Sequence, residues 1–226
     1  MLAEAVQQTI SVLVCDDHRL LTETLTAVLG RDPAIAPLVP AVHSPEEAIE
    51  VCRTRHPNVV LMDIEFKSSM SGIEATRRIK AVSPTTKVVV MTAHEEDRLL
   101  VEAVEAGASG FLRKTEGVDE LLATVKAAAA GEILIDQAQL ARLLPRVARE
   151  REVNRDAQLL LSQLTPRERE ILQLLGQGMR NEAVGAALYI SPQTVQTHIR
   201  NILTKLGVHS KLEAVVFALR HGAISL

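Results

Sequence analysis

Asn58-Val59-Val60-Leu61-Met62-Asp63 is a short, almost wholly apolar run that ends in a carboxylate. Such a run is typical of a strand that is buried on both faces of a parallel sheet. Asp63 then stands at the carboxyl end of this strand. Ligands of open α/β sheets bind at that edge, so the run predicts both a sheet and the place of its site.

Other apolar runs end in polar residues in the same way. They are followed by these groups: Asp16 and Asp17 after residues 10–15, Thr92 after residues 87–91, and Lys114 after residues 108–112 and Arg113. If the strands are parallel, all of these groups gather along one edge of one sheet. For a single residue, an ordinary surface position would be the better interpretation. Their repetition after successive strands favours a functional site.

Helical patterns alternate with these strands. They cover residues 19–29, 45–56, 73–82, 95–106 and 117–130. Residues 38–41 are a weaker candidate for the remaining strand. The alternation predicts a doubly wound, flavodoxin-like (βα)₅ sheet with helices on both sides.

The length and charge distribution predict two domains. Residues 1–130 carry 13 Lys and Arg against 19 Asp and Glu, whereas residues 161–226 carry 7 against 4. An acidic front and a mildly basic tail indicate different partners for the two ends. We expect an α/β domain at 10–130, a kinked helical linker at 131–160 and a small all-α domain at 161–226.

Cysteine usage and hydropathy indicate a cytoplasmic protein. Two cysteines are too few for a disulfide framework. The first residues lack the basic and apolar regions of a signal peptide. No apolar run approaches the roughly 20 residues that span a bilayer, so we expect no membrane partner.

The gathered polar groups of the front domain suit phosphoryl chemistry. Asp16, Asp17 and Asp63 would repel one another unless a divalent cation binds, and Mg²⁺ prefers such oxygen ligands. A carboxylate beside the cation can attack phosphorus and form an acyl phosphate. Lys114 and the Thr92 hydroxyl could then bind the phosphoryl oxygens.

The tail carries strong helix-start signals. Thr165-Pro166-Arg167-Glu168 forms a predicted capping box with proline at the first helical position, and Ser191-Pro192 starts a later helix. A short helix at 181–188 and a turn precede that later helix, which runs from Pro192 to Leu206. This order predicts a helix-turn-helix.

The helix from Pro192 to Leu206 has an apolar stripe and an opposite polar face. The polar face has one formal charge and no carboxylate, and its members are Gln193, Gln196, Thr197, Arg200 and Thr204. Gln suits adenine and Arg suits guanine in the major groove. Together with Lys205 and Lys211, these residues are the predicted DNA contacts.

A fourth tail helix begins after Ser210 and has two apolar faces. Leu212, Val215, Val216 and Leu219 form its predicted core face, and Ala214, Phe217 and Ala218 form the second. The second face suggests a contact between two copies of the chain. The alternative is that Phe217 covers the local core.

Residues 10 to about 130 resemble a response-regulator receiver domain through Asp16-Asp17, Asp63, Thr92 and Lys114. The resemblance implies that Asp63 accepts a phosphoryl group from a sensor histidine kinase. It also implies that Asp17, Asp63 and the backbone carbonyl of Glu65 bind Mg²⁺, with Asp16 acting through water. Thr92 and Phe111 would be the switch residues. Lys67 stands where the family usually has proline, in a loop one residue longer.

Residues 164–222 resemble the LuxR-type DNA-binding domain. The matching stretches are Leu164 to Glu170, Thr194 to His198, and Lys205-Leu206. With the receiver in front, nearly the whole chain is similar to the NarL/FixJ response regulators. Glu182 and Gln196 replace lysines that are common there, so we expect weaker nonspecific DNA binding and a smaller salt dependence.

The predicted function is a two-component transcription regulator, not an enzyme, that is phosphorylated on Asp63 and binds promoter DNA as a homodimer. One alternative is a regulator that ignores phosphate and responds to a small molecule or partner, which the Lys67 loop motivates. A less favoured alternative is an aspartate-nucleophile phosphatase. Such enzymes carry a second Asp two residues after the nucleophile, where this chain has Glu65.

Overall fold

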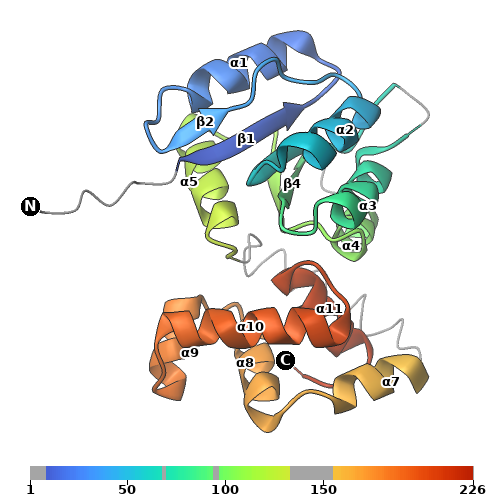
Figure 1. The fold of residues 1–226 in the computed structure, drawn as a ribbon, viewed down its shortest axis with the longest axis vertical. Coiled ribbons are helices and arrows are strands. Elements are labelled where there is room, and N and C mark those ends of the chain that lie inside the picture. Colours follow the sequence, from blue (N-terminus) through green and yellow to red (C-terminus); the bar gives the residue numbers. More distant parts are fainter. Residues whose placement is uncertain (1–8, 68–69, 94–96, 133–154, 226) are drawn as a thin grey trace, which may run out of the picture. The chain divides into compact units, whose positions relative to one another are not determined.

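The structure is a computed structural model that describes residues 9–67, 70–93, 97–132 and 155–225. These residues form two compact units, the first with most of a β-sheet and the second with the C-terminal helices. The predicted linker at 131–160 falls mainly on residues 133–154, which lie outside the described residues. Figure 1 shows the order of the elements along the chain.

The sheet of the described residues is parallel and has five strands in the order β2-β1-β3-β4-β5. Its strands are β1 (Ile10–Cys15), β2 (Ile35–Pro37), β3 (Val59–Asp63), β4 (Lys87–Thr92) and β5 (Gly110–Arg113). Every residue of β3 is buried, as expected for a central strand covered on both faces. The predicted doubly wound fold is confirmed.

Helices connect the strands. They are α1 (Arg19–Leu29), α2 (Pro45–Arg55), α3 (Gly72–Val82), α4 (Asp97–Glu105) and α5 (Val118–Ala129). Of these, α1, α2, α3 and α5 contact the sheet. Helices α2 and α3 pack against each other (Figure 1). Ser44-Pro45 predicts the start of α2, with serine as the N-cap and proline at the first helical position. The Ser44 side chain caps α2 by accepting a hydrogen bond from the Glu47 backbone amide, which confirms this start.

The prediction of a strand at residues 38–41 was wrong. Strand β2 lies earlier, where Ile35 pairs with Ile10 and Pro37 with Val12. Pro40 has no amide hydrogen to donate to a ladder, and pairing with β1 resumes only at Val42, which forms a bridge with Cys15. The position of β2 in the sequence is therefore determined by its pairing with β1 and not by the apolar residues of the segment itself.

The C-terminal helices pack around one central helix. The elements are α7 (Arg155–Ser162), α8 (Pro166–Gly176), α9 (Asn181–Leu188), α10 (Pro192–Leu206) and α11 (Lys211–Arg220). Helix α10 contacts α7, α8, α9 and α11. Both halves of the predicted capping box are present between Thr165 and Glu168.

The turn between α9 and α10 depends on a close backbone approach. A Cβ atom on Gly185 would lie 2.7 Å from the Ile190 carbonyl oxygen. The Ile190 amide donates a hydrogen bond to the Gly185 carbonyl, with a donor to acceptor distance of 3.0 Å. Glycine thus allows the two helices of the predicted helix-turn-helix to meet at this angle.

Helix α11 has buried residues on both of its apolar faces. Leu212, Val215 and Leu219 are buried as predicted, and Ala214 and Ala218 are buried as well. The half-buried Phe217 ring lies edge-on to His221, with 4.7 Å between the ring centres. A contact between two copies through this helix stays a prediction.

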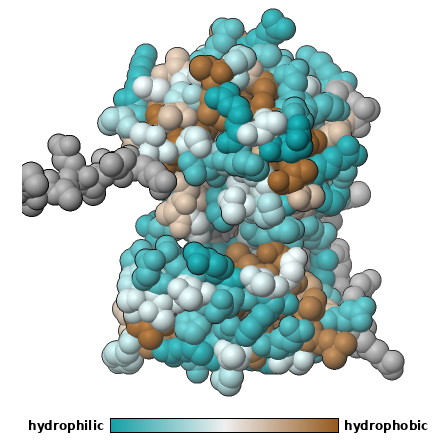
Figure 2. Space-filling view, viewed as in Figure 1, coloured by the Kyte–Doolittle hydropathy of each residue, from teal (hydrophilic) through white to brown (hydrophobic). Residues whose placement is uncertain are grey.

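A few large apolar side chains of the described residues are exposed. They are Leu20, Val39, Val82, Val118, Leu159 and Tyr189. The face in Figure 2 is mainly hydrophilic, with its hydrophobic residues in small separate patches. Within the described ranges, the helices are all too short or too polar to span a bilayer.

Gly72→Ala should destabilise the sheet unit strongly. Its Cβ atom would lie 1.7 Å from the Asp63 carbonyl oxygen, so the backbone on one side would have to move. We expect a loss of roughly 3 kcal/mol in the free energy of unfolding, at the upper end of overpacking costs. Chemical denaturation measures this loss.

Gly30→Ala is the matched control, because a Cβ atom there meets its nearest neighbour at an ordinary 3.4 Å. It should leave stability within about 1 kcal/mol. Equal stability of the two variants would contradict the close approach of residue 72 to the end of β3.

Candidate functional site

The pairing of β1 with β3 brings two carboxylates together. Cys15 lies opposite Met62 in the parallel register, so the next residues, Asp16 and Asp63, stand side by side where both strands end. Asp16 is 0% and Asp63 is 2% exposed. Two buried carboxylates that lie side by side repel each other when both are ionised, and a nearby cation relieves this repulsion.

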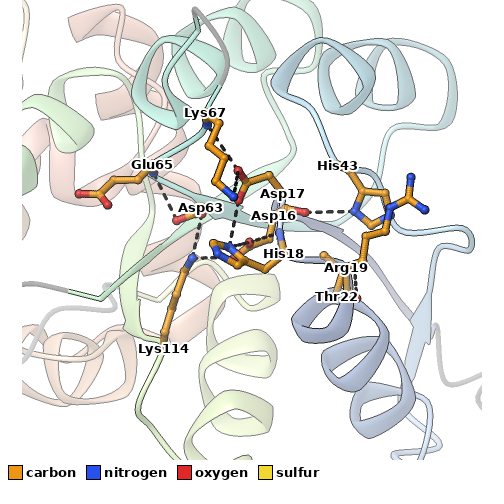
Figure 3. Close-up of polar contacts among 10 residues, drawn as sticks. All are labelled: Asp16, Asp17, His18, Arg19, Thr22, His43, Asp63, Glu65, Lys67 and Lys114. Carbon is orange, nitrogen blue, oxygen red and sulfur yellow. Dashed lines mark hydrogen bonds and ion pairs between the residues drawn. The ribbon is translucent and has the colours of Figure 1, made fainter.

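The Lys114 ammonium supplies one positive charge to this pair. Its Nζ atom lies 2.7 Å from Asp16 Oδ2 and 2.8 Å from Asp63 Oδ2. The Lys114 amide donates to the Thr92 carbonyl, which holds the end of β5 beside the end of β4. Figure 3 shows the Lys114 side chain reaching toward both aspartates.

Asp17, His18 and Lys67 complete the polar cluster. The His18 Nδ1 atom lies 3.0 Å from Asp16 Oδ1 and 2.9 Å from Asp17 Oδ1. The Lys67 ammonium lies 3.9 Å from Asp17 Oδ2, and the Lys67 amide donates to the same oxygen at 3.4 Å. The two carboxylate oxygens of Asp17 therefore face different groups, His18 at Oδ1 and Lys67 at Oδ2.

Glu65 faces the site with its backbone. Its amide donates to Asp63 Oδ1 at 3.3 Å, whereas its carboxylate points away from the cluster (Figure 3). This orientation leaves the side chain of Glu65 outside the group of converging carboxylates. The prediction that Glu65 acts through its backbone carbonyl stays a prediction.

The charges of the site perturb two ionisation equilibria. Burial raises the pKa of the Asp63 carboxyl above its ordinary value; the Asp16 charge adds to this effect and Lys114 opposes it. Burial by itself lowers the pKa of the Lys114 ammonium, but its hydrogen bonds with Asp16 and Asp63 outweigh burial and raise it. The pair of carboxylates is thus incompletely compensated by one lysine.

The donor set fits a divalent cation. Asp16, Asp17, His18 and Asp63 each offer an atom within 4.8 Å of the others. Apart from Lys114 and the His18 ring, the buried oxygens Asp16 Oδ2, Asp17 Oδ1 and Asp63 Oδ2 have no hydrogen-bond partner in the described structure. Carboxylate oxygens are hard ligands of the kind that Mg²⁺ binds.

The two predicted switch residues are both buried. Thr92 ends β4 and is 6% exposed, and Phe111 lies in β5 and is 8% exposed. A hollow beside the carboxylates is lined by the start of α1, Asp63, Glu65, Ala93 and Lys114. The structure therefore assembles Asp16, Asp17, Asp63 and Lys114 and places Thr92 on the adjacent strand end.

The predicted DNA face of α10 is exposed. Val195, Ile199 and Ile202 are buried, and the residues on the opposite side are exposed: Gln193, Gln196, Thr197, Arg200 and Thr204. Two of these threonine hydroxyls, of Thr197 and Thr204, donate to helix carbonyls one turn earlier. The amide and guanidinium groups of Gln196 and Arg200 are the long polar side chains of this face.

The two predicted DNA-contacting lysines make internal contacts. Lys205 Nζ lies 2.9 Å from Glu168 Oε1 and 2.6 Å from Glu168 Oε2, and Glu168 is 2% exposed. Lys211 Nζ donates to Asn181 Oδ1 at 2.7 Å. Sequence reasoning missed these roles, because a capping-box glutamate gives no sign of a partner 37 residues away.

Comparisons with known proteins match two successive parts of the chain. Residues 12–126 match the response regulator receiver domain, and residues 162–218 match the luxR family of bacterial regulatory proteins. The transcriptional regulatory protein DegU of Brevibacillus brevis is 33% identical, over 96% of each chain. The response regulator protein VraR of Staphylococcus aureus is 32% identical, over 96% of this chain and 99% of VraR.

The chain is a NarL/LuxR-type response regulator. A solved LuxR-family response regulator from Aurantimonas is 27% identical, with a TM-score of 0.55 over 62% of this chain and 98% of its own. Members of this family are DNA-binding transcription regulators and not enzymes, which rules out the phosphatase interpretation. Receiver and LuxR-type domains imply a kinase partner and promoter DNA.

Lys205→Met should destabilise the C-terminal helices of this regulator by roughly 3 kcal/mol, because Glu168 would remain buried without its counter-charge. Burial tends to raise the Glu168 pKa, but hydrogen bonds from Lys205 and Thr165 outweigh it and lower the pKa from 4.5. The lowered Glu168 pKa means that the ionised carboxylate stabilises the folded state. This stabilisation is complete at pH values above the ordinary glutamate pKa, and it is lost as pH falls through the lowered pKa of Glu168. Hydrogen exchange of residues 165–206 as a function of pH measures it.

Glu170→Gln is the control for this prediction. It removes an exposed ion pair with Arg167, whose atoms are 2.9 Å apart, and should change stability by less than about 1 kcal/mol. Comparable losses in both variants would count against a structural role of the buried pair.

Proposed function

We propose that phosphorylation of Asp63 by a sensor histidine kinase switches this regulator and that the phosphorylated form binds promoter DNA as a homodimer. The observation that carries the proposal is the convergence of Asp16, Asp17 and Lys114 on Asp63 at the end of β3. A buried carboxylate that faces a lysine and further carboxylates suits a phosphoryl acceptor with a bound cation.

Asp17, Asp63 and the Glu65 backbone carbonyl would hold Mg²⁺, with Asp16 acting through water. The three carboxylates and Lys114 have a formal charge of −3 + 1, or −2, which one divalent cation neutralises. When bound, Mg²⁺ would supply charge to stabilise the oxygens of the phosphoryl group in transfer. The convergence of the three carboxylates within 4.8 Å of one another supports this assignment.

The transfer itself forms an acyl phosphate. An Asp63 carboxylate oxygen attacks the phosphorus of the kinase phosphohistidine, and the phosphorus to nitrogen bond breaks, with the electron pair returning to the imidazole. The Lys114 ammonium, now 2.8 Å from Asp63 Oδ2, would then pair with a phosphoryl oxygen. Lys114 would thereby exchange its contact with the Asp63 carboxylate for a contact with the phosphoryl group.

Thr92 and Phe111 would transmit the event. The Thr92 hydroxyl would hydrogen-bond the phosphoryl group from the end of β4, and Phe111 in β5 would turn inward. Both residues are buried near the strand ends, so a local charge change is coupled to packing rather than to solvent.

DNA binding is proposed for the exposed face of α10. Gln193, Gln196 and Arg200 would reach base edges in the major groove, and Thr197 and Thr204 would contact bases or phosphates. Lys205 and Lys211 are also proposed contacts, and each would have to leave its partner, Glu168 or Asn181. The exposure of the face and the helix-turn-helix arrangement support this role.

A phosphorylation-independent regulator is the second candidate function. The specific observation in its favour is Lys67, whose ammonium lies 3.9 Å from Asp17 and adds positive charge at a proposed cation ligand. Such a permanent charge would weaken cation binding and therefore phosphorylation.

The wild-type chain should gain one phosphoryl group on incubation with Mg²⁺ and a small-molecule phosphodonor, as measured by intact mass. Asp63→Asn should gain none, because its amide is not a nucleophile toward phosphorus. Asp32→Asn is the control, since it replaces a partly exposed carboxylate that is paired with Lys126 and is not part of the cluster around Asp63. Absence of added phosphate on wild type would favour the second candidate.

Arg200→Ala and Gln196→Ala should each weaken specific DNA binding by about 1–3 kcal/mol, because each removes a proposed contact to a base. Their phosphorylation should be unchanged. Fluorescence anisotropy with promoter fragments from genomic binding-site mapping measures the affinities.

Arg53→Ala is the control for charge, since it removes one exposed arginine from α2. Its DNA affinity should match the wild type. Unchanged affinities of both α10 variants would contradict the proposed docking of this face.

A further inference from the structure

Tyr189 is the most exposed of the large, mainly apolar side chains in the described ranges. It is 95% exposed, whereas the next most exposed, Leu20, is 79% exposed. It lies in the turn that joins α9 to α10 (Figure 1), two residues before Ser191, the N-cap of α10. The ring therefore contributes almost nothing to the packing of the C-terminal helices.

The backbone of Tyr189 does not favour a tyrosine either. Its φ of 56° and ψ of 40° are left-handed, a conformation in which glycine and asparagine are the usual residues. The other described non-glycine residue with a positive φ is His56, whose ring nitrogen lies 3.1 Å from Ser83 Oγ. Neither packing nor backbone preference thus accounts for the side chain at position 189, and such residues are common at functional sites.

The surroundings of this turn suit an anion. The Arg167 guanidinium donates from Nη2 to the Leu188 carbonyl oxygen at 2.6 Å, which brings a positive charge next to Tyr189, although Nη1 also pairs with the exposed Glu170. The first turn of α10 contains no acidic residue. Carboxylates of that turn therefore do not oppose a phosphate that approaches Tyr189.

The turn also lies next to the proposed DNA-reading residues. In a helix-turn-helix, the N-terminal residues of the recognition helix contact base edges, and the first helix crosses the DNA backbone. Tyr189 joins these two helices, and the exposed Gln193 follows in the first turn of α10. The junction of the helices is thus expected at the backbone that borders the groove, where tyrosine hydroxyls are regular phosphate contacts.

We propose that the Tyr189 hydroxyl donates a hydrogen bond to a phosphate oxygen of the DNA backbone beside the groove that α10 enters. The inference rests on the proposed DNA binding by α10 and adds a contact outside the polar face of that helix. Phosphate contacts position a protein without reading sequence. Tyr189 therefore strengthens binding to promoter and unrelated duplexes by the same factor.

The single tyrosine of the chain gives a direct readout of this contact. Full-length protein labelled with 3-fluorotyrosine should show one fluorine nuclear magnetic resonance signal, from residue 189. After treatment with Mg²⁺ and the phosphodonor, a promoter duplex should shift or broaden this signal. An unchanged signal in a sample whose duplex is bound, as measured by fluorescence anisotropy, would overturn the inference.

Tyr189→Phe keeps the ring and removes the hydroxyl. It should weaken binding of promoter and unrelated duplexes alike by about tenfold, because a hydrogen bond to a charged group is lost. Tyr189→Asn should weaken binding equally and should keep or raise the midpoint of thermal unfolding, because asparagine tolerates the left-handed backbone. The asparagine variant thus separates the DNA contact from a role in folding.

Leu159→Ala is the control, since it removes a 64% exposed apolar side chain from α7 and should bind both duplexes as wild type does. Wild-type affinity of Tyr189→Phe would overturn the inference, as would a loss confined to the promoter duplex. The proposed docking of α10 stands in both cases if Arg200→Ala and Gln196→Ala still weaken binding. Failure of the wild type to bind either duplex would overturn the proposed DNA binding itself, and this inference with it.

Discussion

The parallel pairing of β1 with β3 is the constraint on which the site depends. Its register sets Cys15 opposite Met62, so both strands end in a carboxylate at the same height. The apolar residues before them are fully buried, and burial of both faces leaves no freedom to slip the register by one residue without exposing the core. Hydrophobic packing of two strands thus holds Asp16 and Asp63 together against their repulsion.

The negative charge of the site therefore exceeds the positive charge that Lys114 supplies. Lys114 contacts both buried carboxylates, yet the Asp63 pKa remains raised by burial and by Asp16. A site of this kind gains stability from any further positive charge, and it changes when negative charge arrives. The repulsion is confined to a few side chains at the strand ends, because the strand residues beneath them are apolar and buried.

The C-terminal helices show the opposite arrangement. There the buried Glu168 is paired with Lys205 and accepts a hydrogen bond from the backbone amide of Thr165, the N-cap of α8, so its charge has a counter-charge and a backbone donor. This pair ties the start of α8 to the end of α10 and orients the helix that presents Gln196 and Arg200. The site at the strand ends thus holds a buried carboxylate pair with one counter-charge, whereas the C-terminal helices hold a buried carboxylate with a counter-charge of its own.

Local sequence signals were sufficient for much of this protein. Ser44-Pro45, Thr165-Pro166 and Ser191-Pro192 predicted helix starts, because capping involves neighbours in the chain. Apolar runs predicted the central strands and the edge where Asp63 lies. Tertiary structure alone decided the position of β2, the pairing of Lys205 with Glu168 and the approach of His18 to two aspartates. These depend on partners distant in sequence or on side-chain direction, which composition and spacing do not specify.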